Sequence, residues 1–112
     1  MKKPIITFED FLKLDIRVGQ VIKAEKLEKS EKLIRLQVDF GQEIGSIQIL
    51  TGLAQYYQPK NLKDKKFLFL INLEPKKMLG ELSYGMILVA NINDKPTIFS
   101  VSKKLPDGSF LY

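Results

Sequence analysis

Residues 34–40 alternate strictly between apolar and polar side chains, beginning at Ile34 and ending at Phe40. A period of two places the apolar side chains on one face of a β-strand and the polar side chains on the other. This segment therefore predicts a half-buried strand, and it commits the chain to a sheet with a core on one side.

Other apolar runs between turn residues predict further strands. The run 67–71 has no polar alternation, so both of its faces are expected to be buried. In the run 16–25, Gly19 is expected to mark a bulge or a bend. The remaining predicted strands cover residues 46–49, 86–92 and 97–101.

Two short helices interrupt the predicted strands. Residues 7–14 follow helical spacing, with Thr7 as the N-cap and an apolar stripe that begins at Phe8. A helix this short is marginal alone, so the stripe is expected to dock on the core of the domain or, alternatively, on a partner subunit. Residues 52–58 predict a second helix, which Pro59 ends.

The order of these elements predicts an all-β chain with five strands closed into a barrel, a short N-terminal helix and a helix between strands three and four. The oligonucleotide-binding (OB) fold has this arrangement and binds nucleic acid across one face and its flanking loops. On that face, Arg35 and Gln37 either present a ligand or are merely solvated. A generic small β-barrel fits nearly as well. The chain is expected to be a single domain, residues 1–112.

The composition argues against catalysis and against a membrane. The chain has no His and no Cys, so it lacks the usual general base, metal ligands and thiol nucleophile. No GxGxxG or P-loop motif occurs, and we expect no cofactor and no metal site. No apolar run reaches the ~20 residues that span a bilayer, and the N-terminus lacks the apolar segment of a signal peptide. These features predict a cytoplasmic protein that binds and does not catalyse.

The charge of the chain is strongly positive. Eighteen Lys and Arg residues oppose thirteen Asp and Glu residues, for a net charge of +5. A lysine-rich surface keeps a protein soluble, and it can also form a face that binds polyanions. The positions of the lysines favour the second interpretation, because six of them fall within residues 60–77 against only Asp64 and Glu74.

Residues 72–86 carry the polar side chains expected at a binding surface. Lys76 and Lys77 each supply a mobile ammonium suited to phosphate, provided that the segment is a loop, since their side chains diverge in an extended segment. A solvated loop is the alternative. Asn72 suits a base edge or a 2′-hydroxyl, or else it caps the turn after a strand.

Three further residues of this segment each have two interpretations. Ser83 either binds a phosphate or closes the turn. Tyr84, between Ser83 and Gly85, is expected to be exposed and can stack on an unpaired base. Met86 either lies against a base or ribose, or belongs to the core.

Several motifs follow one another in an order that resembles one family. The most specific is Asn72–Gly80, and Leu14–Gly19, Leu50–Leu53 and Ser83–Leu88 accompany it. Together they resemble the tRNA-binding domain that occurs as a free-standing structure-specific tRNA-binding protein, as a C-terminal domain or beta subunit of methionyl-tRNA synthetases, and in EMAPII-like cofactors. The resemblance covers nearly the whole chain from about residue 6.

The resemblance implies an OB barrel that binds tRNA through its elbow, and a homodimer in which the terminal segments form much of the interface. It implies tRNA contact for Lys32, Asn72, Lys76, Lys77, Ser83 and Met86, to which we add Tyr84 as a stacking candidate. The chain departs from the family pattern at Glu31, Leu79 and Tyr84. Because folded tRNA is mostly A-form, recognition is expected to depend on shape, phosphate and 2′-hydroxyl contacts.

The sequence therefore predicts non-catalytic, structure-specific tRNA binding through a basic loop face, with delivery of tRNA to an aminoacyl-tRNA synthetase as a further expectation. The alternative is a secretion-chaperone-like protein that binds unfolded peptides at a dimer groove, a branch that residues 39–45 resemble. A third hypothesis is a tRNA-docking subunit of a synthetase. The expected partners are tRNA, a second copy of the chain and a synthetase.

Overall fold

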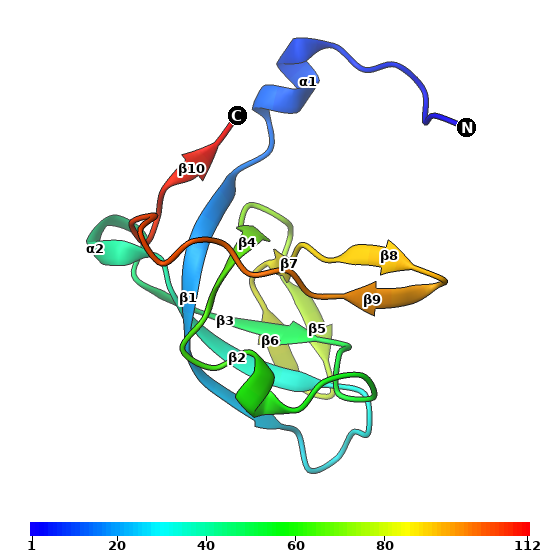
Figure 1. The fold of residues 1–112 in the computed structure, drawn as a ribbon, viewed down its shortest axis with the longest axis vertical. Helices are drawn as coiled ribbons and strands as arrows, with labels where there is room; N and C mark the ends of the chain where they lie inside the picture. Colours follow the sequence, from blue (N-terminus) through cyan, green and yellow to red (C-terminus); the bar gives the residue numbers. More distant parts are fainter.

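Strand β1 pairs along both of its edges and so organises the sheet, which the computed structural model describes for residues 1–112 (Figure 1). The main sheet runs in the order β3-β2-β1-β4-β7, and β10 pairs with the start of β1. All neighbouring strands in it are antiparallel. Its strands are β1 (Ile16–Lys26), β2 (Ile34–Asp39), β3 (Ser46–Thr51), β4 (Lys66–Leu70), β7 (Met86–Ile87) and β10 (Phe110–Leu111).

The sheet curls into a nearly closed barrel because β3 approaches the segment that precedes β7. The Tyr84 amide donates to the Gln48 carbonyl at 3.1 Å, and the Leu50 amide donates to the Ser83 hydroxyl at 3.0 Å. The structure thereby confirms the predicted all-β fold with a barrel of five strands, which are β3, β2, β1, β4 and β7.

The core fills the barrel and follows the alternation predicted for β2. Ile34, Leu36 and Val38 are fully buried, and the polar residues between them are half-buried. Phe40 and Phe69 meet edge to face with their ring centroids 5.4 Å apart. The apolar run in β4 is fully buried only at Phe67 and Phe69, whereas its other face is partly exposed. The cluster is completed by Val21, Ile49, Leu53, Ala54, Leu62 and Ile87.

Gly19 allows a very close approach inside the barrel. A Cβ atom at this position would lie 2.6 Å from Phe40 Cε1 and 2.6 Å from Val38 Cγ1, so a larger residue would force the core apart. The bulge predicted near Gly19 instead falls between Val21 and Lys23, where the register of β1 on β2 shifts.

Two hairpins lie outside the main sheet, and the β8–β9 hairpin projects from the barrel in Figure 1. Strand β5 (Lys76–Met78) pairs with β6 (Glu81–Ser83), and β8 (Ala90–Ile92) pairs with β9 (Lys95–Thr97). The strand predicted at 86–92 is thus divided: β7 completes the barrel and β8 leaves it. Of the strand predicted at 97–101, only Thr97 is in a strand, as the last residue of β9.

Positive backbone φ angles reverse the chain in both hairpins, at Leu79 and Gly80 in the first and at Asn93 and Asp94 in the second. Two consecutive positive φ angles are typical of the two-residue turns that match the twist of a hairpin.

The helices are short. Helix α1 (Phe8–Leu12) begins after the predicted cap, where the Thr7 hydroxyl accepts a hydrogen bond from the Asp10 amide at 3.0 Å. The predicted helix between strands three and four is the 3₁₀ helix η1 (Pro59–Asn61), which begins at Pro59 and does not end there. Proline suits the first helical position because no backbone donor is needed there. Helix α2 (Gly41–Ile44) connects β2 to β3.

The expected docking of α1 on the core of the domain is wrong. No residue of α1 is buried, and Phe8 and Leu12 are 70% and 56% exposed. Figure 1 shows α1 and the C-terminus together at one end of the molecule, beyond the barrel. The alternative, docking on a partner subunit, therefore remains.

Of the helices in the structure, none has both the length and the apolar character needed to cross a membrane.

Candidate nucleic-acid interface

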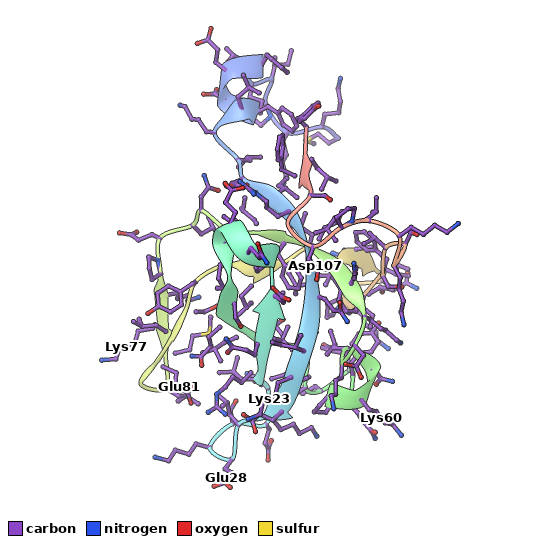
Figure 2. All side chains as sticks on the ribbon, turned by 90° about the vertical axis from the view of Figure 1, so that its left-hand side faces the viewer. Lys23, Glu28, Lys60, Lys77, Glu81 and Asp107 are labelled. Atoms are coloured by element: carbon purple, nitrogen blue, oxygen red, sulfur yellow. The ribbon has the colours of Figure 1, made fainter.

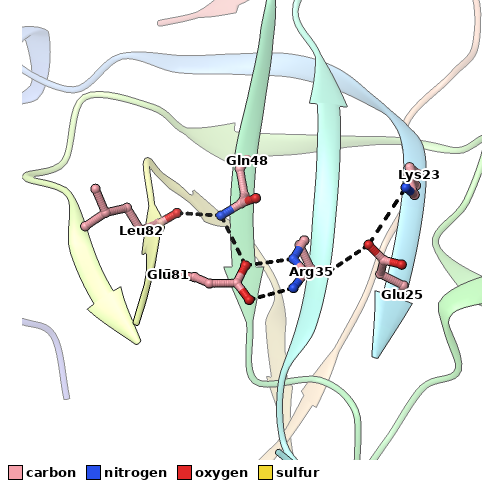
Figure 3. Close-up of polar contacts among 6 residues, drawn as sticks. All are labelled: Lys23, Glu25, Arg35, Gln48, Glu81 and Leu82. Atoms are coloured by element: carbon pink, nitrogen blue, oxygen red, sulfur yellow. Dashed lines mark hydrogen bonds and ion pairs between the residues drawn. The ribbon is translucent and has the colours of Figure 1, made fainter. Parts of the chain in front are cut away.

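A polar network holds the β5–β6 hairpin against the barrel (Figure 3). Arg35 in β2 donates to both carboxylate oxygens of Glu81, at 2.7 Å from Nε and 2.5 Å from Nη2. Its Nη1 atom donates to Glu25 Oε1 in β1 at 2.7 Å. Gln48 in β3 donates to the Leu82 carbonyl at 3.0 Å. Paired, charge-assisted hydrogen bonds of this kind fix geometry strongly, so the hairpin is a well-positioned element.

The network favours the charged form of both partners. Hydrogen bonding from Arg35 holds the pKa of Glu81 below its ordinary value. Hydrogen bonds to Glu81 and Glu25 raise the pKa of Arg35. Arg35 was expected either to present a ligand or to be solvated. Its guanidinium instead holds the β5–β6 hairpin.

A pocket of about 570 Å³ opens between this hairpin, the end of β3 and β7. Its walls are largely apolar, Lys76 is its only cation, and Glu74 is its only carboxylate. The lining consists of residues 50–53, Leu73, Glu74, Lys76, Met78, Ser83, residues 85–87, Val89 and Pro96. An apolar hollow with a few charged groups is typical of a ligand site.

Lys76 and Lys77 diverge, because residues 76–78 form strand β5 and not the expected loop. Successive side chains of a strand point to opposite faces. Lys76 lines the pocket, and Lys77 points outward from the hairpin (Figure 2). Neither ammonium forms an ion pair within the chain, so both are available to anions.

Ser83, Tyr84 and Met86 differ in exposure. Ser83 is only 3% exposed, and its hydroxyl accepts from the Leu50 amide and donates to the Gly85 carbonyl, both at 3.0 Å. These bonds match the turn-closing interpretation of Ser83. Tyr84 is 42% exposed, as expected. Met86 is 45% exposed and lines the pocket, so its alternative placement in the core is wrong.

Asn72 is exposed, yet both polar atoms of its amide are used within the chain. Its Oδ1 atom accepts from the Asp15 amide at 2.9 Å, and its Nδ2 atom donates to the Lys13 carbonyl at 2.6 Å. The side chain therefore ties the segment after β4 to the junction between α1 and β1.

The lysines of residues 60–77 do not form one face. Lys66 Nζ lies 3.0 Å from Asp107 Oδ1 and donates to the Leu105 carbonyl at 2.7 Å, with 11% of its side chain exposed. Lys60 and Lys77 lie on opposite sides of the molecule in Figure 2. Lys32 is exposed, and its carbonyl accepts from the Ala54 amide at 3.0 Å, next to the pocket residue Leu53.

The pocket walls also contain four apolar residues that were not predicted as site residues from the sequence, Leu73, Met78, Val89 and Pro96. One signal was available for Met78, since alternation through Lys76 places it on the same face of β5. The role of Glu81 had no local signal, because its partner Arg35 lies 46 positions away.

No three His, Cys, Asp or Glu residues come together in a way that could hold a metal ion. The pocket lining offers apolar side chains, the Lys76 ammonium, the Glu74 carboxylate and the hydroxyls of Thr51 and Ser83.

Comparison with known proteins gives this site a context. The model of a family described as a putative tRNA binding domain matches residues 16–109. Methionine–tRNA ligase 1 of Bacillus cereus is 41% identical over 104 residues, which are 93% of this chain and 16% of the ligase. The chain thus spans about one sixth of the length of such curated relatives.

Two solved structures share the whole fold. A MetRS related protein from Pyrococcus horikoshii has a TM-score of 0.92 and 38% identity, and the match covers 98% of this chain and 100% of that one. The chaperone CsaA from Bacillus anthracis has a TM-score of 0.86 and 31% identity, with coverage of 97% and 100%. The chain belongs to the putative tRNA binding domain family, whose members are non-catalytic binding domains.

Proposed function

We propose that this chain binds folded tRNA through the β5–β6 hairpin and the pocket beneath it. Lys76, Met86 and Tyr84 supply contacts around the pocket, Lys77 contacts phosphate on the outer face of the hairpin, and Lys32 extends the basic surface. Asn72 and Ser83 shape the site through their hydrogen bonds within the chain.

One observation carries this proposal: a rigidly held hairpin sets an unpaired ammonium, Lys76, against an exposed thioether, Met86, in one largely apolar pocket. The ammonium suits a phosphate, and the thioether and its apolar neighbours suit the face of a base or a ribose. Such a site reads backbone and shape, which is how proteins recognise A-form RNA.

A titration with bulk tRNA over a series of salt concentrations tests the proposal. About four neutralised phosphates give a log–log slope near −3. Absence of binding at low salt would refute the proposal.

A double variant tests the site itself. Lys76→Ala with Lys77→Ala is expected to weaken tRNA binding and to flatten the slope by roughly 1.5, because two phosphate contacts are lost. Lys103→Ala with Lys104→Ala removes the same charge from exposed positions outside the pocket and serves as the control. If the two double variants bind tRNA equally well, the hairpin is not the contact surface.

The single variants separate the two faces of the hairpin. Lys76→Ala alters the pocket, whereas Lys77→Ala removes only an outward charge. An equal loss of tRNA affinity in both single variants would indicate that the RNA contacts both faces of the hairpin.

We further propose that the chain acts as a homodimer through its terminal segments. The apolar side chains of this terminal patch remain exposed, with Phe8 at 70%, Leu12 at 56%, Phe110 at 61% and Tyr112 at 86%. A small apolar hollow of about 190 Å³ lies among Phe11, Leu12, Leu14 and residues 110–112. Exposed apolar area of this kind marks an interaction surface, and two copies on one tRNA would gain avidity.

Delivery of tRNA to an aminoacyl-tRNA synthetase is the cellular role that we propose for this binding. This proposal is supported by relatives such as methionine–tRNA ligase 1, in which the matching region is about one sixth of the whole ligase. Co-purification of a synthetase with the tagged chain tests it, and a chain that purifies alone from cells in several salt conditions argues against it.

A second candidate function is peptide binding by a chaperone. The largely apolar lining of the pocket and the likeness to the chaperone CsaA favour it. Suppression of aggregation that survives high salt would support this candidate, because apolar contacts are not screened by salt.

A further inference from the structure

A second hollowed surface, remote from the Lys77 side of the hairpin, lies around Tyr56. One hollow of about 540 Å³ lies between the end of β1 and residues 54–61. Another of about 330 Å³ lies between Tyr56 and the β8–β9 hairpin. Both are lined by Tyr56 and Tyr57, so the two hollows adjoin at these side chains, and we call them together the Tyr56 trough.

The Tyr56 trough is basic along its length. Lys26 and Lys60 line its first part and Lys95 lines its second part, and no carboxylate lines either part. None of these three lysines has an ion-pair partner in the chain. The acids nearest to these lysines in sequence, Glu25, Asp64 and Asp94, lie outside the lining. Glu25 is paired with Arg35. A row of free ammonium groups without opposing carboxylates suits a phosphodiester backbone.

The two tyrosines have different roles. The Tyr57 hydroxyl accepts a hydrogen bond from the Ile98 amide at 3.2 Å, and its ring packs on the core. The Tyr56 side chain is 46% exposed and its hydroxyl has no hydrogen-bond partner in the chain. An exposed ring at the junction of two basic hollows is a platform on which a base can stack.

The trough also connects with the proposed tRNA pocket. Pro96 lines both the pocket under the β5–β6 hairpin and the second part of the Tyr56 trough. The two sites therefore adjoin at Pro96, so an RNA strand bound at Lys76 and Met86 would have Tyr56 next along the surface.

We propose that the Tyr56 trough binds an unpaired, single-stranded RNA segment, stacking one base on Tyr56 and holding its phosphates with Lys60 and Lys95. This inference extends the tRNA-binding function proposed above by adding a site for RNA that is not in a helix. Stacking on aromatic side chains is tolerant of sequence because every base has a flat face, so the trough selects single strands and not particular sequences.

Fluorescence anisotropy with a labelled oligouridylate, which has no secondary structure, tests the inference directly. The unmodified chain is expected to bind it at low salt, and Tyr56→Ala is expected to weaken binding about tenfold. Tyr56→Phe keeps the ring and should retain most of the affinity. Lys60→Ala with Lys95→Ala should flatten the salt slope by roughly 1.4, the value for two phosphates of a single strand.

Matched controls separate this site from the hairpin site. Lys103→Ala with Lys104→Ala makes the same charge change outside the trough and should leave oligouridylate binding nearly unchanged. Lys77→Ala should weaken binding of folded tRNA with little effect on the oligonucleotide. A chain that binds oligouridylate but not tRNA would refute the proposed function and retain the trough.

A direct readout guards against indirect effects. Photo-crosslinking from 4-thiouridine in the oligonucleotide is expected to label residues 55–61 or 92–97, the two sides of the trough, with mass spectrometry locating the site. The inference is overturned if oligouridylate fails to bind at low salt, if crosslinks fall elsewhere, or if Tyr56→Ala binds as well as the unmodified chain.

Discussion

The Asn72 side chain joins two segments that lie 57 positions apart, because its Oδ1 atom accepts the Asp15 amide at 2.9 Å. The same amide group donates to the Lys13 carbonyl. Asp15 in turn receives a hydrogen bond at 2.8 Å from Arg17, whose guanidinium lies 5.4 Å from the centroid of the Phe110 ring. The segment that leads into the proposed RNA site is thus linked to the terminal patch.

Asn72→Ala tests whether Asn72 positions its neighbouring segments or contacts the RNA directly. Loss of two hydrogen bonds is expected to lower the free energy of unfolding by about 1 kcal/mol, measured by urea denaturation. tRNA affinity should fall a few-fold with an unchanged salt slope, because no charge is removed. Asn91→Ala, at an exposed asparagine without side-chain hydrogen bonds, is the control. Loss of affinity without loss of stability would instead indicate direct contact between Asn72 and RNA.

Glu81→Gln is expected to loosen the β5–β6 hairpin without unfolding the barrel. The amide does not carry the charge that binds Arg35, so amide hydrogens in β5 and β6 should lose exchange protection while those of β1 and β2 keep theirs. tRNA affinity should fall, since the pocket loses a fixed wall. Glu28→Gln, at an exposed carboxylate without an ion pair, should change neither readout.

The same ion pair predicts a pH dependence. Because the pKa of Glu81 is lower in the folded chain, its contribution is present above the ordinary value of 4.5 and is lost as the pH falls through the lowered value. Protection factors in the hairpin should therefore decline at acid pH before those of the barrel strands. In the Glu81→Gln variant this selective decline should be absent.

Local patterns predicted the elements that depend on local chemistry. The alternation of residues 34–40 gives β2, and the Thr7 hydroxyl caps α1, because a strand face and a helix cap are decided within a few positions. The polar contacts of the site are different in kind. Arg35 and Glu81 are 46 positions apart and Asn72 and Asp15 are 57 apart, so no window of sequence shows that these side chains meet.

The divergence of Lys76 and Lys77 had a physical cause that the residues alone do not reveal. Whether two adjacent lysines converge depends on backbone pairing, and β5 pairs with β6 through a turn at Leu79 and Gly80. Leucine is unusual at a positive φ angle, so the sequence did not signal a tight hairpin there. The helix predicted at residues 52–58 also differs, since these residues turn without forming a helix and η1 begins only at Pro59.

Lys66 and Asp107 form a largely buried ion pair, with 11% and 21% of their side chains exposed. Lys66→Ala is expected to destabilise the fold by about 2 kcal/mol, since it leaves the Asp107 carboxylate without its counter-charge and the Leu105 carbonyl without its donor. Lys66→Met with Asp107→Leu should recover most of that loss, because it removes both charges. Lys65→Ala, at an exposed neighbour, should stay within about 0.5 kcal/mol in urea denaturation.

Leu12→Ser with Phe110→Ser tests the proposed homodimer. Sedimentation should give about twice the 12.9 kDa mass of one chain for the unmodified protein and the single mass for the double variant, since the terminal patch loses its apolar character. Ile92→Ser, at a side chain 55% exposed on the other hairpin, should leave the mass unchanged. An unmodified chain that sediments as a monomer at high concentration contradicts the dimer.

Leu79 adopts a φ of 50° at the tip of the β5–β6 hairpin, followed by Gly80 at 81°. A leucine in this left-handed region is strained by about 1 kcal/mol, and its side chain is 58% exposed, so it gains little from burial. Leu79→Asn is therefore expected to raise the free energy of unfolding by roughly 0.5–1 kcal/mol, because asparagine tolerates this backbone. Leu82→Asn, at an exposed leucine of β6 without a positive φ, should give no gain. Since Leu79 lies outside the pocket lining, tRNA affinity should hold. A stabilised variant with weakened tRNA binding would mean that the strained leucine itself contacts the RNA.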